Sequence, residues 1–224
     1  MIFAIDHIVF AATRKQCDDL TGSIRNCGFP AVDFHLDFPD DNLASDSVGF
    51  RGGSSLEFVY ETTECGGPPQ WFAEVPRVIG LGFSSDDFAA DTAWDRKSGS
   101  WTMAEQQGFP NSAGPHEHLS DFYVFVMNRE NGTLQFPELT AGPRLVQITL
   151  SGAGSARWRE RLWRWLKLPV SNGGLTVGGT QIVFEDGPSA NVRASLTFEA
   201  TRNPAIIPLA SGEIRLVSDD RMSH

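Results

Sequence analysis

The chain has 224 residues, of which 41% are hydrophobic, and this is enough to bury a sizeable core. Its 28 acidic and 18 basic residues give a net charge of −10, which argues against the basic surface that nucleic-acid binding requires. Three cysteines without metal-ligand spacing favour a reducing compartment, and no apolar run approaches the roughly 18 residues of a membrane span. We therefore expect a cytoplasmic protein with no nucleic-acid and no membrane partner.

The chain repeats one order of elements: a strand, a helix and then three strands. Alternating or β-branched residues predict the strands, and apolar residues at helical spacing predict the helices. The first repeat is predicted as a strand at 1–12, a helix at 14–26 and strands at 31–38, 47–51 and 54–61. The second is predicted as a strand at 78–84, a helix at 86–97 and strands at 116–127 and 133–138. The third is predicted as a strand at 145–150, a helix at 156–166 and strands at 175–177, 181–184 and 194–198.

These repeats predict three βαβββ modules, at residues 1–70, 76–140 and, in a degenerate form, 143–217. The modules can be aligned residue by residue. The position of His7 in the first module is taken by Gly80 in the second and by Gln147 in the third. The position of Glu57 is taken by Gln135 and Val183 in the same way.

Two polar side chains stand in apolar strands of the first module. His7 lies mid-strand, and a buried imidazole needs a partner for each ring nitrogen, so it either belongs to the hydrogen-bonded core or faces a pocket. Glu57 lies between Leu56 and Phe58, and a buried carboxylate normally has a metal ion, a cation or a hydrogen-bond donor nearby. The alternative is that Glu57 points outward from an alternating strand.

A second group of candidate ligands is His116-Glu117-His118. Two histidines two residues apart on a strand point to the same face, which suits binding to one metal ion. The alternative is a polar loop that leads into the next strand. Gln135 has an amide oxygen that serves as a weak metal ligand or as a partner for a substrate carbonyl, or it is an ordinary outward residue.

Three segments resemble the vicinal oxygen chelate superfamily, in particular its glyoxalase-like domain proteins. They are Asp-His-Ile-Val-Phe at 6–10, Cys-Gly-Phe at 27–29 and Gly-Gly-x-x-Leu-Glu-Phe-Val at 52–59. The resemblance implies an α+β fold in which repeated βαβββ modules form curved, incompletely closed mixed sheets with helices on the outside. It also implies that His7 and Glu57 are ligands of a divalent metal ion.

The resemblance further implies a metal-dependent enzyme of the lyase, isomerase or dioxygenase type that acts on a small oxygenated substrate. The metal would be zinc, nickel, manganese or iron. From their spacing, His116 and His118 are the candidates for the further ligands, which are missing at Gly80 and Gln135. Glu57 or Glu117 would act as the catalytic base, and Gln135 and Gln147 would bind the substrate. The alternative is a metal-free protein that binds or sequesters a small molecule on the same scaffold. Modules of this superfamily pair within or between chains, so a homodimer is compatible with either function.

Overall fold

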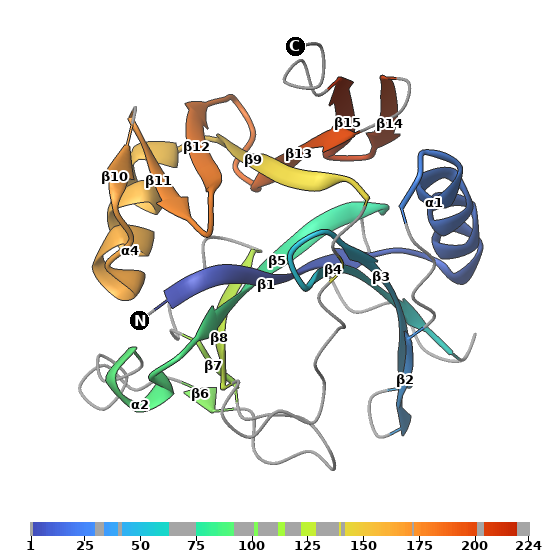
Figure 1. Cartoon of the computed structure of the whole chain (residues 1–224), viewed down its shortest axis with the longest axis horizontal. Coiled ribbons are helices and arrows are strands. Elements are labelled where there is room, and N and C mark those ends of the chain that lie inside the picture. Colours follow the sequence, from blue (N-terminus) through green and yellow to red (C-terminus); the bar gives the residue numbers. More distant parts are fainter. Residues whose placement is uncertain are drawn as a thin grey trace.

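The computed structural model describes residues 2–29, 34–39, 42–62, 75–91, 101–102, 112–114, 122–128, 139, 142–171, 173–200 and 204–218. Their strands form two mixed sheets, one of eight strands and one of seven, which lie one above the other in Figure 1. This confirms the expected α+β class with curved mixed sheets. Within these ranges no helix is both long enough and apolar enough to cross a bilayer.

The first sheet is built from the N-terminal part of the chain in the order β2-β3-β4-β1-β5-β8-β7-β6. Its strands are β1 (Ile2–Ala11), β2 (Phe34–Phe38), β3 (Leu43–Phe50), β4 (Ser54–Glu61), β5 (Arg77–Ser85), β6 (Trp101–Thr102), β7 (Ser112–Gly114) and β8 (Tyr123–Asn128). Helix α1 (Arg14–Asn26) follows β1, and the short helix α2 (Phe88–Asp91) follows β5. The expected strand at 133–138 lies outside the described residues.

The second sheet has the order β10-β11-β12-β9-β13-β15-β14. Its strands are β9 (Arg144–Gly152), β10 (Val170–Ser171), β11 (Gly174–Val177), β12 (Thr180–Asp186), β13 (Arg193–Ala200), β14 (Ala205–Leu209) and β15 (Gly212–Ser218). Helix α4 (Ser155–Leu166) follows β9. The strand expected at 194–198 to complete the third module is β13, which pairs antiparallel with β9 on the side away from β12.

One connection recurs three times along the chain. A strand is followed by a helix and by further strands, the last of which returns to pair parallel with the first. These parallel pairs are β1 with β4, β5 with β8, and β9 with β12. Their registers place opposite one another His7 and Ser55, Gly80 and Tyr123, and Gln147 and Gln181. The module ranges 1–70, 76–140 and 143–217 stay predictions.

Local sequence explains why the first helix forms where it does. Thr13 and Gln16 make a capping box, in which each side chain bonds the backbone N–H of the other residue. Cys17, Leu20 and Ile24 follow at helical spacing and are buried on one side of the helix. The helix ends before Gly28, whose φ of 93° is a left-handed conformation that glycine adopts without a steric penalty.

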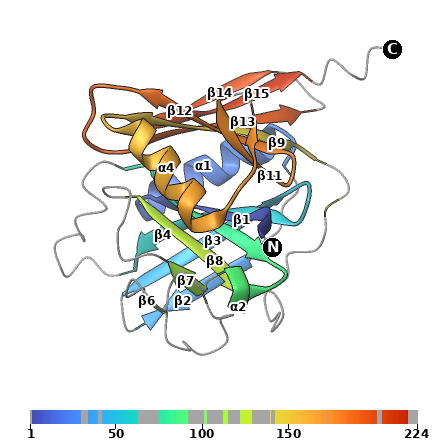
Figure 2. The same cartoon turned by 90° about the vertical axis from the view of Figure 1, so that its left-hand side faces the viewer.

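The main hydrophobic core lies between the two sheets. Ile8 and Phe10 of β1 point into it from the first sheet, and Ile148 and Leu150 of β9 do so from the second. Figure 2 shows α1 and α4 in the layer between the sheets, and Figure 1 places them at its two sides. Because strand side chains alternate, His7 on β1 and Gln147 on β9 point away from this core.

Candidate functional site

His7 and Glu57, which are 50 positions apart in the chain, lie together on the first sheet. In the parallel pair of β1 and β4, His7 is opposite Ser55, and Glu57 stands two residues further along. The two side chains are diagonal neighbours on one face, and His7 Nε2 lies 3.4 Å from Glu57 Oε2. Their side chains are 13% and 15% exposed, so both reach the surface of the sheet that faces away from the core.

Asp6 holds the other side of the imidazole. Ile5 pairs with Phe83 and His7 with Gly82, so Asp6 is an extra residue at a β-bulge. The buried Asp6 carboxylate lies 2.9 Å from His7 Nδ1 through Oδ1, and it accepts a 2.6 Å hydrogen bond from Ser84 Oγ through Oδ2. A carboxylate can only accept, so the Nδ1 atom of His7 carries a proton and its Nε2 atom is directed at Glu57.

Glu57 is oriented from its other side by β3. Ser45 Oγ donates a 2.8 Å hydrogen bond to Glu57 Oε1, which leaves Oε2 as the atom nearest the imidazole. Two carboxylates therefore flank one histidine. With His7 as the imidazolium and both acids ionised, the group carries one net negative charge, and a neutral imidazole would make it two. This charge disfavours an anionic ligand next to His7.

An aromatic ring closes the other side of the site. The Phe125 ring of β8 lies 4.9 Å from the imidazole between ring centroids, at an angle of 53°. It lies over Gly82 of β5, where an added Cβ would come within 2.7 Å of Phe125 and 3.0 Å of His7. The missing side chain at Gly82 thus makes room for the contact between Phe125 and His7. The site has polar groups on one side and a flat apolar wall on the other.

Solved structures with this architecture come from several proteins of low sequence identity. A hypothetical protein from Staphylococcus aureus matches 97% of this chain and 100% of its own, with a TM-score of 0.62 and 9% identity. A mutant of 4-hydroxymandelate synthase from Streptomyces coelicolor matches 92% of this chain and 77% of its own, with a TM-score of 0.61 and 12% identity. A 2,2',3-trihydroxybiphenyl 1,2-dioxygenase from Sphingomonas wittichii matches 100% of this chain and 95% of its own, with a TM-score of 0.61 and 9% identity.

The chain has the vicinal oxygen chelate fold. At these identities the likeness shows the fold alone. No protein-family model matches the sequence, and no curated protein matches it. Because both modules of the first sheet have the same strand pairing, the residues that correspond to His7 and Glu57 in the second module can be identified from the strand register.

Within the described part of this vicinal oxygen chelate fold, strand pairing gives Glu57 a counterpart on β8. The strand that pairs parallel with β5 is β8, as β4 pairs parallel with β1. With His7 aligned on Gly80, the residue two positions after the partner Tyr123 is Phe125. The half-buried residues of β8 alternate as Tyr123, Phe125 and Met127, none of which is a carboxylate. Gln135 lies outside the described residues, so its alignment with Glu57 stays a prediction.

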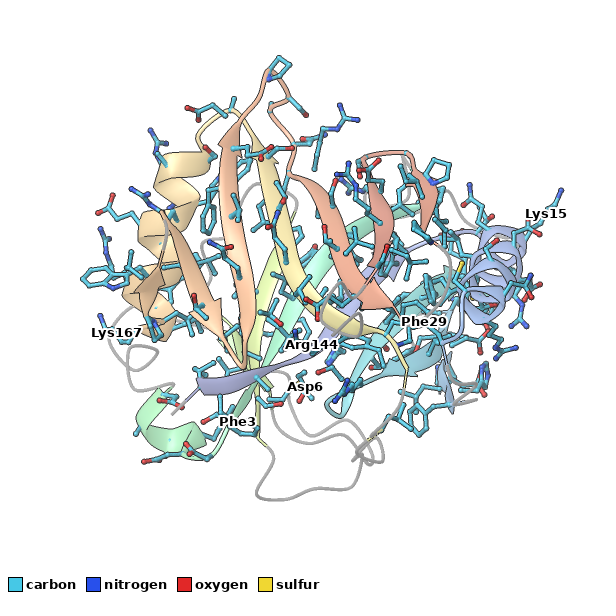
Figure 3. All side chains as sticks on the ribbon, turned by 45° about the horizontal axis from the view of Figure 1, so that its top comes forward. Phe3, Asp6, Lys15, Phe29, Arg144 and Lys167 are labelled. Carbon is cyan, nitrogen blue, oxygen red and sulfur yellow. The ribbon has the colours of Figure 1, made fainter. Side chains whose placement is uncertain are left out.

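Of the remaining predicted site residues, only Gln147 belongs to the described part of the chain, and it does not lie on this face. His116, Glu117, His118 and Gln135 lie outside the described residues. Gln147 lies on β9 of the second sheet, where its Nε2 donates a 2.9 Å hydrogen bond to Thr149 Oγ1. Gln147 points to the opposite face of β9 from the buried Ile148 and Leu150. Figure 3 labels Asp6 on β1 of the first sheet. The hydrophobic core separates Gln147 from His7.

Sequence reasoning missed the residues that orient the site, namely Asp6, Ser45, Ser84 and Phe125. Simple alternation puts Asp6 and His7 on opposite faces, and only the bulge brings their side chains together. The described residues contain no group of three or more His, Cys, Asp or Glu side chains that could hold a metal ion. A metal site needs at least three protein ligands, so on these residues the fit to a metal is incomplete.

Proposed function

We propose that the protein binds a small molecule, without a metal ion, on the face of the first sheet that carries His7 and Glu57. The observation that supports this is the orientation of the two side chains by Asp6 and Ser45. A largely buried ion pair contributes little to stability once its desolvation is counted. The oriented pair is therefore better explained as a binding feature than as a stabilising one.

The chemistry of the site defines the class of ligand. With Nδ1 held by Asp6, the Nε2–H of an imidazolium donates, and the neighbouring Glu57 Oε2 accepts. A ligand group that both accepts and donates, such as an amide or a hydroxyl, matches this arrangement. The ring of Phe125 favours a planar part of the ligand beside that group. The two carboxylates disfavour an anion.

Three isosteric probes test this proposal: benzamide, benzamidinium and benzoate. Benzamide donates and accepts, benzamidinium only donates, and benzoate only accepts and is anionic. We expect benzamide to bind best and benzoate worst in saturation-transfer NMR. Glu57→Gln should weaken benzamide binding while the circular dichroism spectrum stays unchanged, and His7→Ala is the second variant. The proposal is wrong if no probe binds, or if both variants bind benzamide as well as the wild type does.

A second candidate function is a divalent-metal-dependent enzyme of the lyase, isomerase or dioxygenase type. One distance favours it: two ligand atoms that each lie about 2.0 to 2.2 Å from one tetrahedral ion are about 3.4 Å apart. His7 Nε2 and Glu57 Oε2 have this separation. Elemental analysis after expression with zinc, nickel, manganese and iron would support this function if the protein retained one metal per chain that His7→Ala removed.

The partners follow from the same reasoning. A small molecule is the proposed partner, and the net charge of −10 is the reason to expect no nucleic acid. The homodimer and the cytoplasmic location stay predictions.

A further inference from the structure

Phe125 lies at the position in the second module that corresponds to Glu57 in the first module. Strands β1 and β5 run antiparallel at the middle of the first sheet, with β4 outside β1 and β8 outside β5. This arrangement relates the first module to the second by an approximate two-fold rotation. His7 and Glu57 therefore have Gly80 and Phe125 as their counterparts across the rotation axis.

The contacts of the Phe125 ring place it on the same face as His7. An added Cβ on Gly80 would lie 3.7 Å from the Phe125 ring, and one on Gly82 would lie 2.7 Å from it. The ring thus lies across both glycines of β5 and against the imidazole. It covers the part of the sheet from which the second module would supply donor atoms.

We infer that Phe125 determines the ligand specificity of this site, because it replaces a metal ligand and turns a metal-binding arrangement into a metal-free pocket with an aromatic wall. This rests on the proposed function. A phenyl ring has no lone pair for a metal ion. Among the described residues, His7 and Glu57 then supply two donors, one fewer than a stable site needs.

The inference predicts that one substitution supplies the missing donor. Phe125→Glu puts a carboxylate at the counterpart of Glu57, and Phe125→His puts an imidazole there. Phe125→Leu is the matched control, because it removes the ring and adds no donor. The change at Gly80 is less suitable, since an added Cβ there would lie 3.2 Å from the backbone oxygen of Tyr123.

The test is equilibrium dialysis of the full-length protein against zinc, nickel or manganese, followed by elemental analysis. We expect about one metal ion per chain in Phe125→Glu or Phe125→His, and no stoichiometric metal in the wild type or in Phe125→Leu. Cobalt gives a second readout, since its visible absorption reports the coordination. Adding His7→Gln to Phe125→Glu should abolish the uptake. Circular dichroism confirms that each variant is folded.

The outcomes separate this inference from the proposed function. If folded Phe125→Glu and Phe125→His take up no more metal than Phe125→Leu, the role of Phe125 is refuted, while benzamide binding by the wild type still supports the proposed function. If the wild type itself binds one metal ion through His7, both the inference and the metal-free proposal are wrong. If benzamide does not bind but the Phe125 variants gain metal, only the proposed function fails.

Discussion

Asp6→Asn tests whether the bulge on β1 serves to position His7. The substitution keeps the size of the side chain and one acceptor oxygen, but it removes the charge that faces His7 Nδ1 at 2.9 Å. Asp6 is 3% exposed, so water does not replace the lost interaction. Ser84 Oγ lies 2.6 Å from Asp6 Oδ2, and in the variant it would contact either the remaining oxygen or the amide nitrogen of Asn.

The expected cost follows from these contacts. A hydrogen bond to a charged group contributes about 1.5 to 3 kcal/mol, and the substitution weakens the contact of Asp6 with His7, so we expect a loss of about 2 to 3 kcal/mol. For a chain of this length 1 kcal/mol corresponds to a shift in Tm of about 2 to 4 °C, so Tm should fall by about 4 to 12 °C. Urea and thermal unfolding measure this loss.

Asp37→Asn is the matched control. Asp37 also lies beside a histidine, 3.1 Å from His35 Nε2, but its side chain is 72% exposed. An exposed pair of this kind contributes at most about 1 kcal/mol. A long-range ¹H–¹⁵N spectrum of the imidazole should show Nδ1 of His7 protonated in the wild type and a changed protonation pattern in Asp6→Asn. An equal, small loss of stability in both variants, with an unchanged spectrum, would refute the positioning role of Asp6.

Three further predictions concern a pH dependence, a thiol and a glycine. The hydrogen bond to Asp46 raises the pKa of His35 above 6.5, so its contribution to stability is complete below pH 6.5 and is lost as the pH rises through the folded value. Since His35 is half exposed, this contribution is less than about 1 kcal/mol. In urea unfolding, the wild type should lose this much more stability between pH 6 and pH 8 than His35→Asn does. A gain of stability over the same pH range would contradict this. Burial raises the pKa of the Cys17 thiol to about 12, so iodoacetamide at pH 8 should modify it only after unfolding, and rapid labelling of the native protein would show otherwise. Gly82→Ala should destabilise the protein by about 1 to 3 kcal/mol and weaken benzamide binding, because the added methyl group would clash with Phe125. Gly22→Ala is the control: Gly22 lies in α1 with open space around it, so this variant should be more stable by about 0.5 to 1 kcal/mol. Equal effects of the two substitutions would disprove the packing argument.

Local pattern was sufficient for α1, β1 and β4 of the first module, whereas β3, expected at 47–51, spans Leu43–Phe50. The apolar spacing of Cys17, Leu20 and Ile24 and the alternation on both sides of Glu57 are properties of neighbouring residues. They predict α1, β1 and β4 close to their observed bounds. The resemblance then pointed to His7 and Glu57, whose side chains do lie within 3.4 Å of each other.

By itself, the sequence determined the α+β class, the repeated order of elements and the pair of His7 and Glu57. Only the tertiary structure decided that β8 is the parallel partner of β5, that a bulge turns Asp6 toward His7, and that the core separates Gln147 from the site. The physical reason is that alternation along a strand says which residues share a face, whereas strand pairing and register depend on contacts between distant segments. A shift of one residue, such as the bulge at Asp6, changes the neighbours of a side chain without changing the local pattern.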